Sequence, residues 1–203
     1  MNSKISTIAI VILAAGKSER LGSPKQLLSF NGKNLLRHSV DAALGTGCPS
    51  VFVVLGANIE LLRKELKDKP VMVVENKGWQ EGMASSIRCG LESIIGTILR
   101  PDCVIFMVCD QPYVSSSLLL SLVEKKQETS KPIVASSYED IIGTPALFHK
   151  NLFAALMELT GDKGARKLIA DNPEKVVTVP FPEGITDIDT ASDYELLKKE
   201  NDY

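Results

Sequence analysis

The chain has 203 residues, of which 44% are hydrophobic and 24% charged, and its formal net charge is −2 at pH 7. These values are typical of one globular domain without a membrane span, so we expect residues 1–203 to form a single domain. The small net charge does not favour a nucleic-acid partner. The four cysteines form no Cys-x-x-Cys pair, which favours free thiols in a cytoplasmic protein over a zinc site or disulfides.

Short β-branched runs alternate with helical patterns along the chain. The expected strands are 7–13, 51–55, 71–74, 104–108, 133–136, 146–149 and 176–179. The expected helices are 35–44, 59–67, 83–95, 116–128, 151–158, 164–171 and 192–200. This alternation predicts an α/β fold of three layers, α/β/α, with a mostly parallel sheet. Residues 137–144 break the pattern, and we expect them to form an irregular substrate-binding loop.

The first expected strand leads into a loop with three cations, Lys17, Arg20 and Lys25. The apolar run before it also has the outline of a secretion signal, but its β-branched residues favour a buried strand. A Gly-Lys-Ser triplet at 16–18 matches the end of a P-loop, yet position 11 is Val where that motif requires Gly. Cations and small residues directly after a buried strand still favour phosphate binding; the alternative is an ordinary turn with solvated lysines.

The segment Leu-Ala-Ala-Gly-Lys-Ser-Glu-Arg-Leu-Gly-Ser-Pro-Lys at 13–25 resembles the LAAGxSxRxGxxK signature of GT-A-type nucleotidyltransferases. Within them it is most similar to the MobA/MocA-like molybdenum-cofactor nucleotidyltransferases. The resemblance implies a Rossmann-like fold, a loop that wraps a triphosphate, and catalytic roles for Arg20 and Lys25 in neutralising phosphate charge. The nucleotide-binding residues that it implies here are Leu13, Ala14, Ala15, Gly16, Lys17, Ser18, Arg20 and Lys25.

Two further motifs agree with this resemblance. Asp110 ends an apolar strand, where a carboxylate suits Mg²⁺ although a turn-forming Asp is an alternative; the resemblance makes it a catalytic, nucleotide-binding metal ligand. Gly82, Ser85 and Ser86 lie at an expected helix start. The resemblance places these three beside the base and ribose, whereas the residues alone also fit a capped amphipathic helix.

Three later segments complete the implied site. Gly143, Pro145, Lys163 and Arg166 resemble the family's acceptor-binding residues, with a Gly-rich helix lead-in as the alternative for the last two. Asp189 is the implied second ligand of Mg²⁺, with Asp187 as the other candidate. Both carboxylates could instead simply favour the start of the last helix, where Thr190 is the expected N-cap.

The resemblance implies transfer of a nucleotide monophosphate from an NTP to a phosphate-bearing acceptor, with release of pyrophosphate. Ala15 is typical of the branch that uses CTP, with molybdopterin as the acceptor and a molybdoenzyme as a possible partner. Three alternatives remain: a GTP-using guanylyltransferase, a sugar-1-phosphate nucleotidyltransferase, and a non-catalytic nucleotide-binding or cofactor-delivery factor.

Overall fold

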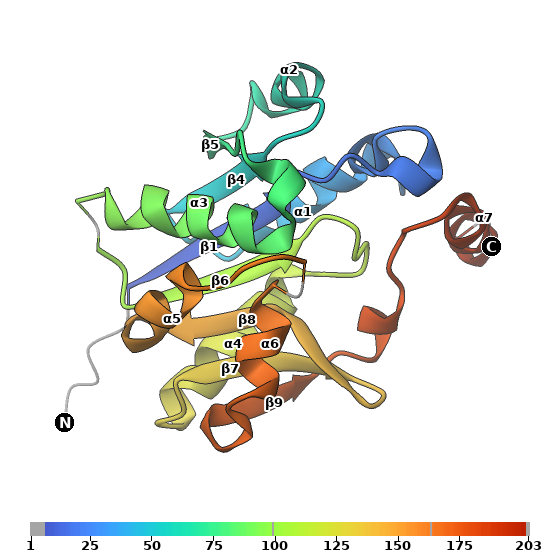
Figure 1. The fold of residues 1–203 in the computed structure, drawn as a ribbon. Coiled ribbons are helices and arrows are strands. Elements are labelled where there is room, and N and C mark those ends of the chain that lie inside the picture. The colour runs from blue at the N-terminus through green and yellow to red at the C-terminus, as the bar shows by residue number, and fades with distance from the viewer. Residues whose placement is uncertain (1–6, 99, 163, 202–203) are drawn as a thin grey trace.

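The computed structural model describes residues 7–98, 100–162 and 164–201, and within these ranges seven strands form one sheet (Figure 1). The strands are β1 (Ile8–Ala14), β4 (Val51–Leu55), β5 (Met72–Glu75), β6 (Cys103–Val108), β7 (Ile133–Tyr138), β8 (Ile141–His149) and β9 (Val176–Pro180). They lie in the order β5-β4-β1-β6-β8-β7-β9. Only β8 among these strands runs antiparallel to its neighbours, so the sheet is mostly parallel.

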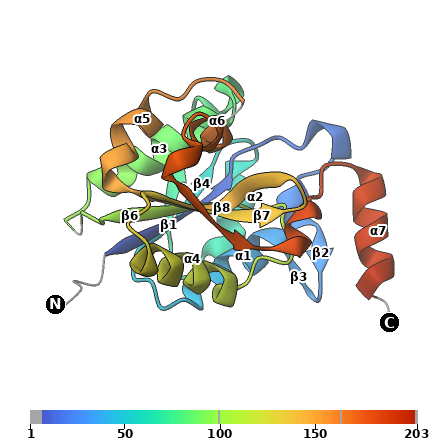
Figure 2. The ribbon, with the colours of Figure 1, turned by 90° about the horizontal axis from the view of Figure 1, so that it is seen from below.

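Helices cover both faces of this sheet (Figure 2). One face carries α1 (Leu35–Leu44), α2 (Ile59–Leu62) and α4 (Ser116–Glu128). The other carries α3 (Met83–Ile95), α5 (Phe153–Met157) and α6 (Gly164–Ala170). The last helix, α7 (Ala191–Asn201), lies beyond the ends of the central strands (Figure 1). The predicted three-layer α/β/α arrangement is therefore confirmed.

The core follows from the alternation of side chains along the strands. In β1, Ile10 and Ile12 face the layer that contains α1 and α4, whereas Ala9 and Val11 face the layer that contains α3. All four are at most 1% exposed, as expected for a central parallel strand buried on both faces. Helix α3 packs closely at Gly90, where a Cβ would lie 2.8 Å from Cγ1 of Val11.

The expected element boundaries hold well in the first two-thirds of the chain. Helices α1, α3 and α4 span the predicted residues, and each central strand is present with small shifts at its ends. The expectation of an irregular loop at 137–144 is wrong. These residues extend β7 and β8 into a hairpin whose register shifts between Ala135 and Ser136.

A second hairpin, which the sequence pattern did not reveal, lies between the first loop and α1. It pairs the two-residue strands β2 (Ser29–Phe30) and β3 (Lys33–Asn34). Asn34 ends it and caps α1, because its side chain accepts a hydrogen bond from the Arg37 N–H at 2.9 Å. None of the helices in the described ranges is long and apolar enough to cross a membrane.

An apolar cluster joins the chain before α7 to this hairpin region; we call it the C-terminal anchor. Its buried residues are Phe30, Leu35, Ile188 and Leu197. The Tyr194 hydroxyl adds a polar contact by donating to the Ser29 carbonyl at 2.9 Å. The C-terminal anchor thus brings residues 187–190 back to the end of the sheet where β1 and β6 finish.

We expect Ile188→Ala to lower the free energy of unfolding by about 2–4 kcal/mol, because it empties a fully buried position. Ile188→Val, which removes one methylene, should cost about 0.5–1.5 kcal/mol. Urea unfolding at neutral pH measures both. Equal, small losses for the two variants would show that the C-terminal anchor does not hold this segment.

Candidate functional site

Three distant segments meet at the side chain of Lys25. Its Nζ lies 2.5 Å from Oδ2 of Asp110 and 2.8 Å from Oδ1 of Asp189. Arg20 approaches the other oxygen of Asp189, with Nη2 at 2.7 Å from Oδ2. Two cations of the first loop therefore bind the two carboxylates that were predicted as metal ligands.

Partial burial makes these charges strongly interdependent. Burial alone would lower the pKa of Lys25, but the attraction and hydrogen bond of Asp110, together with the hydrogen bond of Asp189, outweigh it and raise that pKa. The hydrogen bond from Lys25 lowers the pKa of Asp189 against the opposing effect of burial, and Arg20 lowers it further. Lys25 is thus charged and Asp189 ionised at neutral pH.

The first loop is shaped by local hydrogen bonds rather than by a regular helix. Ser18 adopts a left-handed conformation with φ 61°, and its hydroxyl accepts a hydrogen bond from the Lys25 N–H at 3.0 Å. The loop turns again at Gly22, with φ 69°. At Gly16 a Cβ would meet nothing within 4 Å. The protein itself does not crowd this position, so the open space is available for close approach of a ligand to the backbone.

Asp110 lies two residues after the end of β6, and a hydrogen bond of its own backbone fixes it. Its carbonyl accepts a hydrogen bond from the Ile188 N–H at 3.1 Å, which ties the Asp110 turn to the segment carrying Asp189. While Oδ2 of Asp110 binds Lys25, Oδ1 is buried and has no hydrogen-bond partner among the described residues. A buried carboxylate oxygen without a partner is costly and is suited to accept a further cation or donor.

The neighbouring carboxylates of the last segment differ in their surroundings. Partial burial, followed by the charges of Asp110 and Asp189, raises the pKa of Asp187. Asp189 is held by a capping box at the start of α7: Thr190 accepts from the Asp193 N–H at 3.2 Å, and Asp193 accepts from the Thr190 N–H at 2.7 Å. The expected N-cap at Thr190 is therefore present.

The serines at the start of α3 are engaged inside the protein. Ser85 and Ser86 are each 5% exposed, and both accept hydrogen bonds from the Asn76 amide, at 2.8 and 3.0 Å. Gly82 has φ 96°, and a Cβ there would come within 2.8 Å of the Gly161 backbone. Gly82 thus lets the start of α3 approach the loop before α6. The Ser85 and Ser86 hydroxyls bind Asn76 and do not face open solvent.

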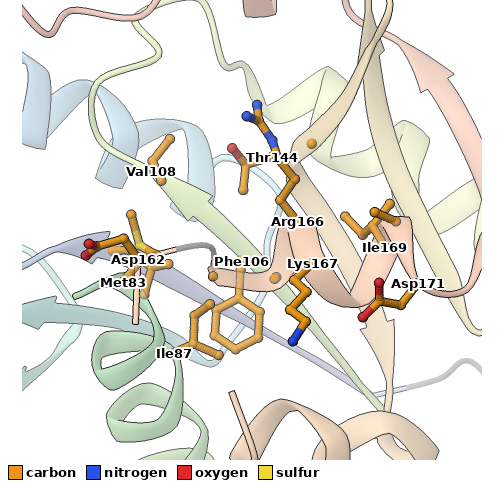
Figure 3. Close-up of a pocket in the computed structure, with 15 residues that line it drawn as sticks. Met83, Ile87, Phe106, Val108, Thr144, Asp162, Arg166, Lys167, Ile169 and Asp171 are labelled. Carbon is orange, nitrogen blue, oxygen red and sulfur yellow. The ribbon is translucent and has the colours of Figure 1, made fainter. Parts of the chain in front are cut away.

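A cavity of about 610 Å³ lies between α3, α6 and the sheet (Figure 3). Leu13 and Val108, at the ends of β1 and β6, line it together with Gly143 and Arg166. A hydrogen bond from Thr144 Oγ1 to Oε1 of Gln111, at 3.3 Å, links its wall to the residue after Asp110. The cavity therefore adjoins the charged cluster.

The predicted acceptor residues are only partly gathered at this cavity. Arg166 is exposed and extends toward Thr144, away from Lys167 (Figure 3). It forms no ion pair with any residue in the described ranges. Pro145 is buried in β8, where its carbonyl accepts from the Ser136 hydroxyl at 2.8 Å. Lys163 lies outside the described residues.

No thiolate or imidazole is available at the charged cluster. Burial, with the adjacent charge of Asp110, raises the pKa of Cys109 to about 12, which keeps the thiol neutral. His38 is engaged with the Phe30 carbonyl, and His149 accepts from the Asn151 N–H. The chemistry that this cluster supports is thus charge neutralisation and positioning, without a covalent intermediate on Cys or His.

Residues 10–176 match the MobA-like NTP transferase domain. The chain belongs to this family. Strands β4 to β8, the cation-bearing loop after β1 and Asp110 all lie within the matched segment. Membership makes the protein a nucleotidyltransferase, and it confirms the resemblance seen in the first loop.

The chain is also similar to two proteins along nearly its full length. The chain is 30% identical to nicotine blue oxidoreductase of Paenarthrobacter nicotinovorans over 201 residues, covering 92% of this chain and 95% of that protein. It is 27% identical to purine catabolism protein PucB of Bacillus subtilis, with coverage of 93% and 95%.

The fold is also similar to a crystal structure of Rv0371c from Mycobacterium tuberculosis. The TM-score is 0.81 at 30% identity, with coverage of 96% of this chain and 100% of the other. A complex of Rv0371c with manganese aligns with a TM-score of 0.77 at 28% identity, covering 96% and 99%. Manganese is thus found with a structural neighbour of this chain.

Three buried amides of the site were missed by the sequence reasoning. They are Gln26, Asn76 and Gln111, at 1%, 5% and 5% exposure. Gln26 and Gln111 directly follow Lys25 and Asp110 in the sequence. That adjacency was the available signal, because a side chain next to a site residue in a tight turn often fixes the turn.

The ion pairs of Lys25 predict a specific pH dependence of stability. Lys25→Met should lower the free energy of unfolding by about 1–3 kcal/mol at pH 7, between the values for exposed and buried pairs. Because the pKa of Asp189 is depressed, its stabilising contribution is present at neutral pH and is lost as the pH falls below about 4.

Urea unfolding of both proteins between pH 7 and pH 3.5 tests this. The difference between wild type and Lys25→Met should shrink toward the acidic end, as Asp189 becomes protonated. A difference that does not change with pH would show that these ion pairs add nothing to stability.

Proposed function

We propose that the chain transfers CMP from CTP to the phosphate of molybdopterin, in a Mg²⁺-dependent reaction that releases pyrophosphate. The observation that carries this proposal is the contact of Lys25 with both Asp110 and Asp189 at the end of the first loop. A loop rich in small residues and cations, opposite two carboxylates, has the charges that a metal-bound triphosphate requires.

In this proposal the loop residues bind the nucleotide and neutralise its charge. Leu13 to Ser18 supply the backbone that lies along the triphosphate. Lys25 exchanges its carboxylate partners for phosphate oxygens when the nucleotide binds, and with Arg20 it stabilises the charge that develops on the α-phosphate and on pyrophosphate. The acceptor phosphate is already an anionic nucleophile, so a general base is not needed.

The carboxylates fit a divalent metal. The donors are all oxygen, the preference of Mg²⁺, and Oδ1 of Asp110 is buried without a hydrogen-bond partner in the part of the chain that the structure describes. No group of three or more His, Cys, Asp and Glu side chains in the described ranges is arranged to hold a metal. That suits Mg²⁺, which commonly takes one or two carboxylates and completes its shell with phosphates and water. When bound, the metal would polarise the phosphates as a Lewis acid.

Asp110 and Asp189 are the proposed ligands, rather than Asp187. Asp189 already contacts the same ammonium as Asp110, at 2.8 Å. The raised pKa of Asp187 makes it the poorer ligand, because a metal binds the ionised carboxylate.

The cavity beside the charged cluster is the proposed acceptor site. Its floor is apolar, with Leu13, Phe106 and Val108, and Arg166 supplies a cation at its wall. This combination suits a flat ring system that carries a phosphate. Gly143 lies beside the guanidinium and leaves space for the Tyr138 hydroxyl, which a Cβ at position 143 would approach to 2.6 Å. Pro145 and Lys163 are also assigned to acceptor binding in this proposal.

The nucleobase is proposed to bind near the start of α3. There Gly82 allows the close approach of two loops, while Ser85 and Ser86 act through Asn76 by fixing the helix start. The preference for CTP rests on Ala15. A cytoplasmic location, and delivery of the product to a molybdoenzyme, complete the proposal.

An activity matrix tests the substrates. Purified protein with Mg²⁺ is mixed with CTP, GTP, ATP or UTP and with molybdopterin or sugar 1-phosphates, and pyrophosphate release is followed. We expect turnover with CTP and molybdopterin. Turnover with GTP but not CTP would overturn the base assignment, and turnover with sugar phosphates alone would overturn the acceptor. Nucleotide binding without turnover on any acceptor would favour a delivery factor.

Asp110→Asn should lower Mg²⁺-dependent turnover by at least about a hundredfold, because a catalytic metal ion contributes several kcal/mol. It should also weaken Mn²⁺ binding to the enzyme with a non-hydrolysable CTP analogue, as measured by electron paramagnetic resonance. Asp102→Asn is the matched control, since Asp102 pairs with Lys150 at 2.7 Å far from the first loop. Unchanged Mn²⁺ binding in Asp110→Asn would remove Asp110 from the metal site.

A further inference from the structure

One buried side chain binds the backbone at the point where β1 leads into the first loop. Gln26 follows Lys25 in the chain and is 1% exposed. Its Nε2 donates to the Ala14 carbonyl at 3.0 Å and to the Gly16 carbonyl at 2.9 Å. Both amide hydrogens therefore form hydrogen bonds with backbone carbonyls at the end of β1.

These contacts fix the direction of the neighbouring N–H groups. The peptide bonds between residues 14 and 18 are trans, so each carbonyl points opposite to the N–H of the next residue. With the carbonyls of Ala14 and Gly16 turned toward Gln26, the N–H groups of Ala15 and Lys17 point away from it. The Ala15 carbonyl is fixed separately, by the Ala57 N–H at 3.0 Å, which orients the Gly16 N–H.

The oriented N–H groups make no hydrogen bonds to the described part of the protein. Within the described ranges, none of the backbone N–H groups of residues 15–18 donates a hydrogen bond to a protein acceptor. Gly16 and Lys17 are exposed, and space is open at Gly16. The N–H groups of Ala15 and Lys17 both point away from Gln26, and two backbone donors aligned in this way suit an anion.

Burying the Gln26 amide costs stability, which indicates that the amide is needed for these two contacts. Its Oε1 is buried and has no hydrogen-bond partner among the described residues. An unsatisfied buried acceptor destabilises the fold, and a methionine would fill a similar volume without that cost. The packing of this position alone therefore does not explain a glutamine.

We propose that Gln26 is a positioning residue that presets the backbone N–H groups of Ala15 and Lys17 for the β- and γ-phosphates of the nucleotide. This inference rests on the proposed function, because it assumes that the first loop binds a triphosphate. Gln26 does not touch the substrate; it acts through the two carbonyls that it holds. The same turn, Lys25–Leu27, carries both the ammonium and this amide, so one local structure sets both the charge and the donors of the loop.

Isothermal titration calorimetry with CMP and with a non-hydrolysable CTP analogue, in the presence of Mg²⁺, tests the inference. In wild type the analogue should bind much more tightly than CMP. Gln26→Met should reduce that ratio by at least about tenfold, since hydrogen bonds to a charged group contribute more than an order of magnitude in affinity. Affinity for CMP should change little, which a general loss of structure would not reproduce.

Ser39→Ala is the control for loss of a buried hydrogen bond. The Ser39 hydroxyl is buried and donates to the Leu35 carbonyl at 3.1 Å inside α1, away from the loop. This variant should keep the wild-type ratio. If Gln26→Met does not fold, Gln26→Glu retains the shape, and its protonated carboxyl can donate to only one of the two carbonyls, so we expect an intermediate ratio.

The outcomes separate this inference from the proposed function. If wild type binds the analogue no better than CMP, the triphosphate site and this inference both fail. If wild type shows the preference and folded Gln26→Met or Gln26→Glu keeps it in full, Gln26 does not position the loop, and the proposed function stands unchanged.

Discussion

The ammonium of Lys25 is the point on which the site depends. Asp110 and Asp189 lie 79 residues apart in the sequence, and both contact the same Nζ atom. Without a cation between them, two ionised and partly buried carboxylates would repel each other. Lys25 therefore allows the residues after β6 and the segment before α7 to lie together at the carboxyl ends of the central strands. The side chain that organises the charges in the ligand-free protein is also the one proposed to stabilise the phosphates.

Apolar packing places the segments that carry these charges close enough to form ion pairs. Ile188 is fully buried between Asp187 and Asp189, and with Phe30 and Leu197 it fastens the chain beside the first loop. The backbone bond from the Ile188 N–H to the Asp110 carbonyl fixes the register of this contact. The burial of Ile188 stabilises this contact. The carboxylates of Asp110 and Asp189 lie at its partly exposed margin. The division resembles that of other α/β proteins, in which the loops at the carboxyl ends of strands carry the ligand site.

The sequence was sufficient for the parts of this molecule in which local pattern and burial agree. β1 and β6 are continuous apolar runs, and α1, α3 and α4 have regular apolar faces, so their positions were predictable. Residues 137–144 were not, because polar and glycine residues in a hairpin give no two-residue alternation. The engagement of Ser85 and Ser86 by Asn76 was equally hidden, since a buried amide is recognised only by its partners. Lys25, Asp110 and Asp189 were singled out by motif, but their contact depends on the C-terminal anchor, a tertiary feature.

The charges of the free site also constrain how its ligands can bind. Lys25 and Arg20 balance Asp110 and Asp189 in the ligand-free protein. A triphosphate alone adds negative charge beside these carboxylates, and a divalent cation alone has to compete with an ammonium for them. When both bind together, the cation takes the carboxylates while the phosphates take Lys25 and Arg20, so each ligand removes the penalty that the other would meet. Such reciprocal coupling is a binding free energy shared between two ligands. In the proposed reaction it makes the metal–nucleotide complex, rather than either component, the species that fits this site.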